Sequence, residues 1–307
     1  MAARATRSAS RAASSSDDAS RCLLLALSHD ELGVIVDGLA DPLQPVVAVT
    51  FNSTCKGLRT PLGAALEVLK ERHEKAAALC RKLDKSCAGL SGAKMSCAEV
   101  LGAEMLNAAC CLVADDAATL AMILQTNGLP CLRELYLGGS GFGDAGMQVL
   151  CGGLGRGAAP SLRILSLADN KFGPAGAEAL AAALGRGAFP QLVTLFLYQN
   201  PIGKQGVAAL AAPLRKMPAL KELFLGQCQI GDEGVASLVD NLGKDDFKKL
   251  ERLYLGHNQI TDAGVAKLLA AIDAGGLPKM RGLSLAHNPA SDAACTAVSD
   301  AVAKLSQ

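Results

Sequence analysis

The 307-residue sequence lacks several features that would point to a particular class of protein. It has no tryptophan, and its aromatic side chains are limited to three tyrosines and seven phenylalanines. The 30 Lys and Arg residues almost balance the 29 Asp and Glu residues, so no global field steers the chain onto nucleic acid or a membrane surface. No apolar run approaches the roughly 20 residues of a membrane-spanning helix. We therefore expect neither nucleic acid nor a membrane as a partner.

Disulfide chemistry is also missing from the pattern. The 11 cysteines are odd in number and contain no CxxC pair, unlike the dense, even sets of small secreted scaffolds. We interpret them as reduced thiols of a cytoplasmic or nuclear protein. Residues 1–21 carry Arg4, Arg7 and Arg11 among Ala and Ser, which is the composition of a disordered tail and also of an organelle transit segment. Both interpretations stay open.

What the sequence does have is an internal repeat, and half of its residues are hydrophobic. Six segments follow the pattern LxxLxLxxN, continued by an apolar residue, a GxxG-like turn and an alanine-rich helical stretch. They start, at steps of 28 or 30 residues, at Leu132, Leu162, Leu192, Leu220, Leu250 and Met280. One such unit buries too few side chains to offset its loss of conformational entropy, so neighbouring units must stack.

The consensus assigns a side to each position. In LxL the two leucines point to one face of an extended strand, and the residue between them points to the other. A polar residue at the asparagine position can satisfy backbone groups where the strand turns toward the helix. Cys228 replaces asparagine in one repeat and suits this structural role as a weak donor. The structural positions are Asn170, Asn200, Cys228, Asn258 and Asn288, with Ser140 in the first unit.

These units resemble the long leucine-rich repeats typified by ribonuclease inhibitor, which have 28 to 30 residues and a true helix per unit. The resemblance implies an α/β solenoid, a horseshoe with a parallel sheet inside and helices outside, preceded here by a small helical region. An offset of 30 residues adds a degenerate first repeat at 101–131, with Met105 and Asn107 on the strand leucines and Cys110 on the asparagine position. Residues 280–307 would form the C-terminal cap of a repeat domain spanning 101–307, because terminal units are atypical.

Two motifs could suggest a cofactor or a metal. Residues 141–146 read GxGxxG, directly after a predicted strand, as a dinucleotide site requires. Gly143 and Gly146 recur in later repeats, however, so we interpret the motif as a repeat turn and predict no cofactor. His257 and His287 precede the asparagine of their repeats and have no second ligand pattern nearby. We predict ordinary exposed loop residues there and no metal.

The side chains expected on the concave face are unusually aromatic. The outward position of LxL holds four of the ten aromatic residues, and Tyr198 follows at the end of its strand. Rigid aromatic side chains on a solvent-facing sheet favour protein binding, although aromatic residues also simply suit strands. Neighbouring charges of both signs, from Arg133 and Glu134 to Glu251 and Arg252, suit a protein partner. The predicted binding residues are Tyr136, Phe196, Tyr198, Phe224 and Tyr254.

Residues 22–100 predict a helical N-terminal region. A capping box at 28–31 opens the run LGVIVDGLA, which Asp41-Pro42 closes, and residues 62–85 predict a charged helix with Glu71 paired to Lys75. Residues 27–60, from HDEL to TCKGLR, resemble an F-box, the module that links substrate receptors to the adaptor of a cullin-based ubiquitin ligase. The closing stretch lacks the aromatic residue often found in that family. The alternative is a helical cap on the solenoid.

Three functions remain open at this stage. The main prediction is a non-catalytic protein–protein interaction module, because no Ser/His/Asp, metal-ligand or paired-carboxylate constellation stands outside the repeat consensus. The first alternative is an F-box-type substrate receptor of a cullin-based ubiquitin ligase. The second is a GTPase-activating protein of the Ran-regulating type, which shares this long repeat but typically ends in an acidic tail, whereas this sequence ends in KLSQ.

Overall fold

The computed structural model describes residues 41–45, 49, 63–83, 95–126, 129–155, 158–243 and 245–305. Contacts within the chain divide it into two units, residues 1–75 and 76–307. The tail at 1–21 lies outside the described residues. So does the F-box-like segment at 27–60, apart from residues 41–45 and 49.

The described part of the first unit consists of a turn and most of helix α4. The turn starts at Asp41, whose carboxylate accepts a hydrogen bond from the Leu43 backbone at 2.8 Å. Helix α4 (Gly63–Cys80) is shorter than the helix predicted over 62–85, and a turn follows it. The expected Glu71–Lys75 ion pair forms at 2.6 Å, but both side chains are exposed and it adds little stability.

The second unit begins with the end of α4 and a short helix, α5 (Cys97–Leu101), and continues as alternating strands and helices. The strands of its described residues are β1 (Met105–Asn107), β2 (Glu134–Tyr136), β3 (Ile164–Ser166), β4 (Thr194–Phe196), β5 (Glu222–Phe224), β6 (Arg252–Tyr254) and β7 (Gly282–Ser284). The helices between and after them are α6 (Asp116–Thr126), α7 (Gly143–Gly152), α8 (Pro174–Gly185), α9 (Gly203–Arg215), α10 (Gly231–Val239), α11 (Asp262–Asp273) and α12 (Asp292–Leu305).

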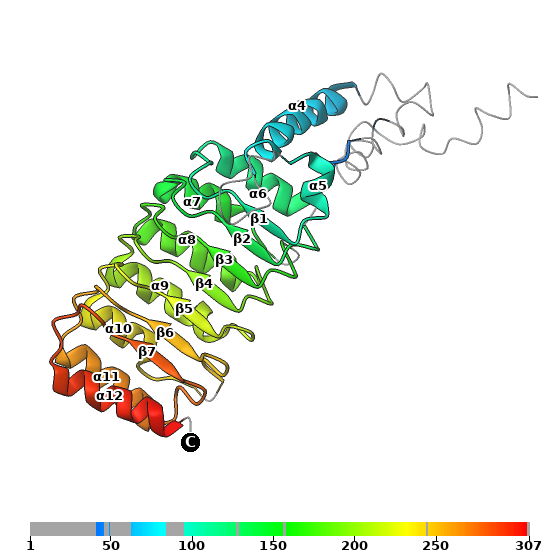
Figure 1. Ribbon diagram of the computed structural model, residues 1–307. Helices are drawn as coiled ribbons and strands as arrows, with labels where there is room; N and C mark the ends of the chain where they lie inside the picture. The colour runs from blue at the N-terminus through cyan, green and yellow to red at the C-terminus, as the bar shows by residue number, and fades with distance from the viewer. Residues whose placement is uncertain are drawn as a thin grey trace, which may run out of the picture. The chain divides into compact units, whose positions relative to one another are not determined.

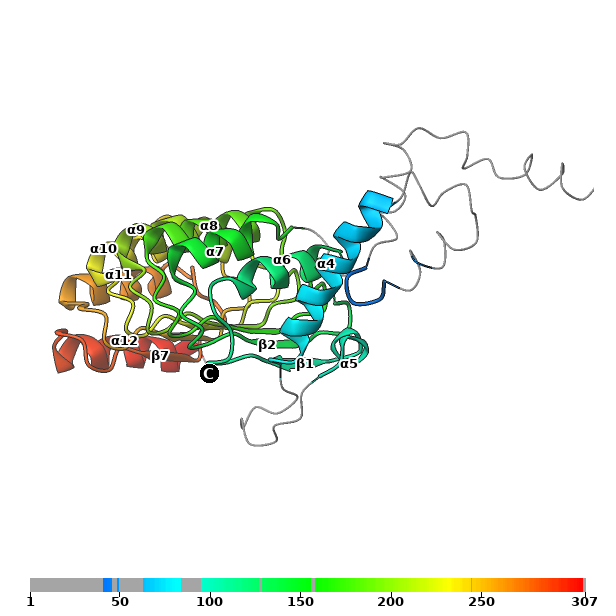
Figure 2. The same ribbon diagram turned by 90° about the horizontal axis from the view of Figure 1, so that it is seen from above.

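The strands form one parallel sheet in sequence order, β1 to β7 (Figure 1). Helices α6 to α11 form a second layer on one side of this sheet (Figure 2). From β2 onward the register follows the repeat, so that Leu135 pairs with Leu165 and Leu165 with Leu195. The predicted α/β solenoid is therefore confirmed. We call the sheet side opposite these helices the open face.

The register predicted for the first repeat is wrong by one residue. Strand β1 is present, but Leu106 pairs with Leu135, which corresponds to an offset of 29 residues instead of 30. Leu106 is completely buried, whereas Met105 and Asn107, predicted on the leucine positions, are half-buried. Cys110 consequently occupies the position before the asparagine position. Side chains alternate along a strand, so a shift of one residue exchanges the inward and outward sets.

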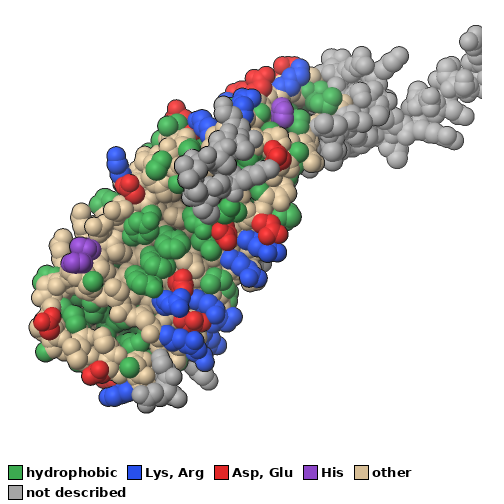
Figure 3. Space-filling view, viewed as in Figure 1, with side chains coloured by type: hydrophobic (Ala, Val, Ile, Leu, Met, Phe, Trp, Pro, Cys, Tyr) green, Lys and Arg blue, Asp and Glu red, His purple; other side chains and the backbone are tan. Residues whose placement is uncertain are grey.

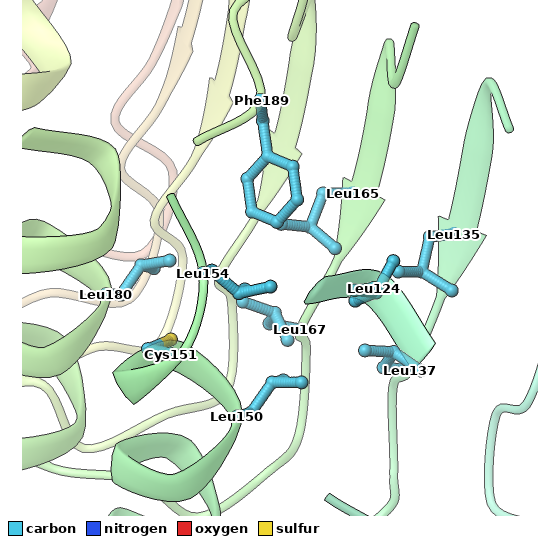
Figure 4. A pocket seen from close by; sticks show the side chains of 10 residues that line it. All are labelled: Leu124, Leu135, Leu137, Leu150, Cys151, Leu154, Leu165, Leu167, Leu180 and Phe189. Carbon is cyan, nitrogen blue, oxygen red and sulfur yellow. The ribbon is translucent and has the colours of Figure 1, made fainter. Parts of the chain in front are cut away.

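Leucines from strands and helices fill the space between the two layers. Figure 4 shows this packing around a void of about 10 Å³ between α6, α7, α8 and strands β2 and β3. All ten lining side chains are leucines apart from Cys151 and Phe189. The void is at the lower limit for one water and offers no polar partners, so it is a packing defect of the core and not a ligand site.

The GxGxxG sequence has a packing role. A Cβ atom on Gly146 would lie 2.9 Å from the Cβ of Phe142, and one on Gly176 would lie 2.7 Å from that of Phe172. The second glycine of each turn therefore lets the helix start close against the preceding apolar side chain. Gly143 has φ of +58°, a conformation that favours glycine. The motif thus belongs to the repeat turn.

Candidate functional site

A column of amides connects neighbouring repeats beneath the turns. Asn258 is completely buried, and its Nδ2 donates to the carbonyl oxygens of Leu225 at 2.5 Å and Leu255 at 3.0 Å. Its Oδ1 accepts from the backbone N–H of Cys228 at 2.8 Å. Asn200 donates in the same way to Leu167 and Leu197. The amides therefore satisfy backbone groups in two repeats at once.

Asn288 and Asn170 show how far this column extends. Asn288 donates to the carbonyl oxygens of Leu255 and Leu285, each at 2.9 Å, and accepts from the Asn258 backbone. Asn170 donates to the Leu137 carbonyl at 2.9 Å, but its Oδ1 has no hydrogen-bond partner among the described residues, and neither has the Ser140 hydroxyl. The column is complete toward β7 and incomplete toward β1.

Cys228 occupies one asparagine position as a thiol. Its Sγ lies 3.3 Å from the carbonyl oxygen of Leu197, to which the thiol can donate. Burial raises the pKa of this thiol to about 12, so the unreactive neutral form dominates at physiological pH. These properties suit a packing residue.

The predicted aromatic residues form a stack on the open face. The rings of Phe196 and Phe224 stack with centroids 4.4 Å apart, and those of Phe224 and Tyr254 stack at 4.1 Å with an angle of 6° between their planes. Tyr198 meets Phe196 edge to face at 6.2 Å. Tyr136 is not part of this group: Ser166 lies between it and Phe196 in the sheet, and its hydroxyl donates to Glu134. The structure thus brings together four of the five predicted residues.

A hollow of about 460 Å³ lies beside this aromatic stack, over β5 to β7. Its floor contains Gly226 and Gly256, which follow β5 and β6. They stand at the repeat position that Tyr198 occupies after β4. Rings of Phe224 and Tyr254 line one side. Because the two glycines carry no side chain, the floor is lower here than around the neighbouring repeats.

The opposite wall of the hollow is polar. It consists of Gln199, Gln227, His257 and His287, which share one position in successive repeats. The two imidazole rings stack with centroids 4.2 Å apart. The sequence predicted them as exposed loop residues, and both are exposed. Within the part of the chain that the structure describes, no group of three or more His, Cys, Asp or Glu could hold a metal ion.

Charged side chains border the open face where the strands begin. We call this set the start band; it comprises Arg133, Glu134, Arg163, Lys221, Glu222, Glu251, Arg252 and Arg281. Lys221 pairs with Glu251 at 2.7 Å, and Arg252 pairs with Glu222. Hydrogen bonding to Lys221 lowers the pKa of Glu251. Figure 3 shows basic side chains interleaved with acidic ones along one margin, beside a hydrophobic patch.

Comparison with known families recovers the same repeat. The family described as "Leucine Rich repeat" matches residues 128–151, 158–181, 216–239 and 248–269. The chain contains leucine-rich repeats. Leucine-rich-repeat proteins are typically non-catalytic interaction modules.

Two further comparisons were made, with curated proteins and with solved structures. No curated protein matches the sequence. Among solved structures, the chain is similar to one described as "Crystal structure of TLR13-ssRNA13 complex", with 18% sequence identity and a TM-score of 0.22. The match covers 57% of this chain and 31% of that one. In the described residues, no helix has the length and apolar character needed to cross a membrane.

The leucine-rich repeats also contain a set of carboxylates that sequence analysis missed. Asp232, in the first turn of α10, accepts from the backbone N–H groups of Thr261 at 2.8 Å and Gly264 at 3.0 Å. Asp144 does the same for Gly173 and Gly176, each at 2.7 Å. Each carboxylate therefore caps the helix of the next repeat, where helix N-termini leave N–H groups without partners. The sequence does carry a signal for these caps, because Asp follows the turn residue in several repeats, as in Gly143-Asp144, Gly231-Asp232 and Thr261-Asp262.

Proposed function

We propose that the protein is a non-catalytic interaction module that binds a protein partner on the open face. Leucine-rich repeats generally mediate protein–protein interactions, which supports the general class of function. The partner surface would be centred on the aromatic stack and on Tyr198.

The observation that carries this proposal is the exposure of the aromatic group. Phe196, Phe224 and Tyr254 are only half-buried although they stack on one another, and Tyr198 is 40% exposed. An aromatic ring buries a large apolar area while losing little rotamer freedom, which is why such residues dominate binding at protein interfaces. The inward leucines already form the core and set the register of the strands, so the fold does not require aromatic side chains on the open face.

Quantitative affinity capture from cell extract tests this proposal. The test variant of the full chain carries five changes, Tyr136→Ala, Phe196→Ala, Tyr198→Ala, Phe224→Ala and Tyr254→Ala. Partners that bind through the open face should fall by at least about 10-fold, the loss typical of removing interface hot spots. The control variant changes exposed side chains on the helical side, namely Val149→Ala, Glu178→Ala, Lys204→Ala and Lys267→Ala. Partner recovery equal to wild type in the test variant would refute the proposal.

The more specific alternatives remain predictions. If residues 27–60 bind a ubiquitin-ligase adaptor, the adaptor should co-purify with the full chain, and deleting those residues should abolish this co-purification. A GTPase-activating role requires stimulated GTP hydrolysis in a turnover assay. A cytoplasmic location is likewise a prediction and can be checked by imaging the tagged full chain.

A further inference from the structure

The aromatic stack is open at one end only. In the sheet, Ser166 precedes Phe196 and Ser284 follows Tyr254 at the same position of the repeat. Ser166 is buried, with 8% of its surface exposed, so the Phe196 end offers little room. Ser284 is half-buried and lines the hollow together with Tyr254. A flat group can therefore approach the outer face of Tyr254, above Ser284.

The spacing of the stack fits one additional ring. Consecutive strands lie about 4.8 Å apart in a sheet, and the rings of the stack follow one another at 4.4 Å and 4.1 Å. A ring above Ser284 would continue this series as its fourth member. The neighbouring Gly282, at the outward position earlier in β7, carries no side chain that could occupy this space.

The surroundings of this place contain hydrogen-bond donors and no acidic side chain, so they can accommodate an acidic group. No Asp, Glu, Lys or Arg lines the hollow, whereas the amides of Gln199 and Gln227 and both imidazoles can donate hydrogen bonds. Stacking leaves the ring edges of Phe224 and Tyr254 accessible, and aromatic edges carry partial positive charge.

The start band supplies a cation for an acidic group. The two acids of the band nearest to Arg281 in sequence are already paired, Glu222 in β5 with Arg252 and Glu251 before β6 with Lys221. Arg281 is exposed and forms no salt bridge among the described residues, although it lies close enough to Glu251 to help lower the pKa of that carboxyl. It precedes Ser284 by three residues, or about 10 Å along an extended strand.

We propose that the hollow receives an extended segment of a protein partner whose aromatic side chain stacks on Tyr254 above Ser284, while an acidic residue two or three positions away pairs with Arg281. This inference rests on the proposed function and specifies the chemistry of the partner. The partner ring would complete a stack of four, and the acid would pair with a cation that forms no salt bridge within the described residues.

Selection from a displayed library of random peptides of about 12 residues, with the full chain as bait, tests the inference. Enriched peptides should share an aromatic residue with Asp or Glu two or three positions away. The Ser284→Phe variant places the chain's own ring in the fourth position and should weaken their binding at least 10-fold. Ser284→Ala, the matched control, should bind as wild type does. Phe or Tyr already stands at this position in β4 to β6, so Ser284→Phe is compatible with the fold.

Charge reversal gives an independent readout. Arg281→Glu should weaken binding of the acidic peptides at least 10-fold, and replacing their acid by Lys should restore it. Enrichment of basic or non-aromatic peptides, no enrichment at all, or full binding to Ser284→Phe would overturn the inference. Peptides that bind Ser284→Phe normally but fail on the five-alanine variant would leave the open-face function standing. Partners and peptides that bind all variants equally would overturn both.

Discussion

The two halves of the sheet share one backbone and differ in what they display. Strands β1 to β3 present a single aromatic side chain in the outward column, Tyr136. At their turns, Ser140 and Asn170 each have a buried polar atom with no hydrogen-bond partner in the part of the chain that the structure describes. Strands β4 to β7 present the aromatic stack, and the amide oxygens of their asparagines all accept hydrogen bonds. Parallel pairing continues unchanged through both halves.

This contrast separates two kinds of position in the repeat. The inward leucines fix strand spacing and register, and they are buried in both halves except for Leu283 in the last strand, β7. The outward side chains make no contribution to that register, so the first and second halves can differ in them without a change of fold. The half with the more complete polar network is also the half with the hollow, which places the candidate binding surface on the better-supported scaffold.

The largest expected difference between the halves concerns the buried amide column. Asn258→Ala should lower the free energy of unfolding by roughly 3 to 5 kcal/mol, because it leaves the Leu225 carbonyl and the Cys228 N–H buried without this partner. The Leu255 carbonyl also loses Asn258 but keeps the hydrogen bond from Asn288. Ser140→Ala in the first half should change it by less than about 0.5 kcal/mol, since among the described residues its hydroxyl has no hydrogen-bond partner to lose. Urea unfolding followed by far-ultraviolet circular dichroism measures both. Equal losses of unfolding free energy in the two variants would show that the two halves do not differ in their amide columns.

Sequence could predict the amide column because the repeat itself reveals it. Asparagine recurs at a fixed place after two strand leucines, and its side chain can donate and accept at once. The register of β1, in contrast, could not be predicted. The first unit is one residue shorter than the 30-residue repeat, and it has too few leucines for the periodicity to show where the residue is missing. Only the pairing of Leu106 with Leu135 fixes it. The cap from Asp232 spans two repeats and was likewise invisible within a single unit.

The aromatic column was only partly predictable. Its members follow from the outward position of LxL, but stacking depends on which neighbours are large. Ser166 separates Tyr136 from Phe196, whereas Phe224 joins Phe196 to Tyr254. The hollow depends in turn on Gly226 and Gly256, which were unremarkable in the sequence because small residues are common after a strand.

A second, smaller difference should appear when aromatic residues are removed singly. Phe224→Ala should lower the free energy of unfolding by about 2 kcal/mol, since Phe224 stacks on rings at both sides and is half-buried. Tyr136→Ala should cost about half as much, because Ser166 separates Tyr136 from the three stacked rings. Urea unfolding of the two variants measures the difference. A greater loss for Tyr136→Ala would show that the stack adds no stability to the second half.

The smallest expected effect lies in the start band and depends on pH. The ion pair of the second half, Lys221–Glu251, is 2.7 Å long with Glu251 only 25% exposed, whereas Arg133–Glu104 in the first half is 3.3 Å long with both partners more than half exposed. Hydrogen bonding to Lys221 holds the pKa of Glu251 below its ordinary value of 4.5 in the folded protein. The stabilisation from this shift is therefore present above pH 4.5 and is lost as the pH falls through the lower, folded value.

Glu251→Gln should abolish that loss, which we expect to be roughly 0.5 kcal/mol because solvent screens the pair. Urea unfolding at pH 7 and pH 3 gives the acid-dependent change for wild type, Glu251→Gln and Lys221→Met. Both variants should show the same reduced change, since each removes one partner of a single interaction. Glu104→Gln is the matched change in the first half. The Arg133–Glu104 pair is longer and more exposed, so Glu104→Gln should reduce the acid-dependent change in unfolding free energy less than Glu251→Gln does. A reduction by Glu104→Gln as large as that by Glu251→Gln would mean that the two halves do not differ in their start bands, and that the contrast between them is confined to the amide column and the aromatic stack.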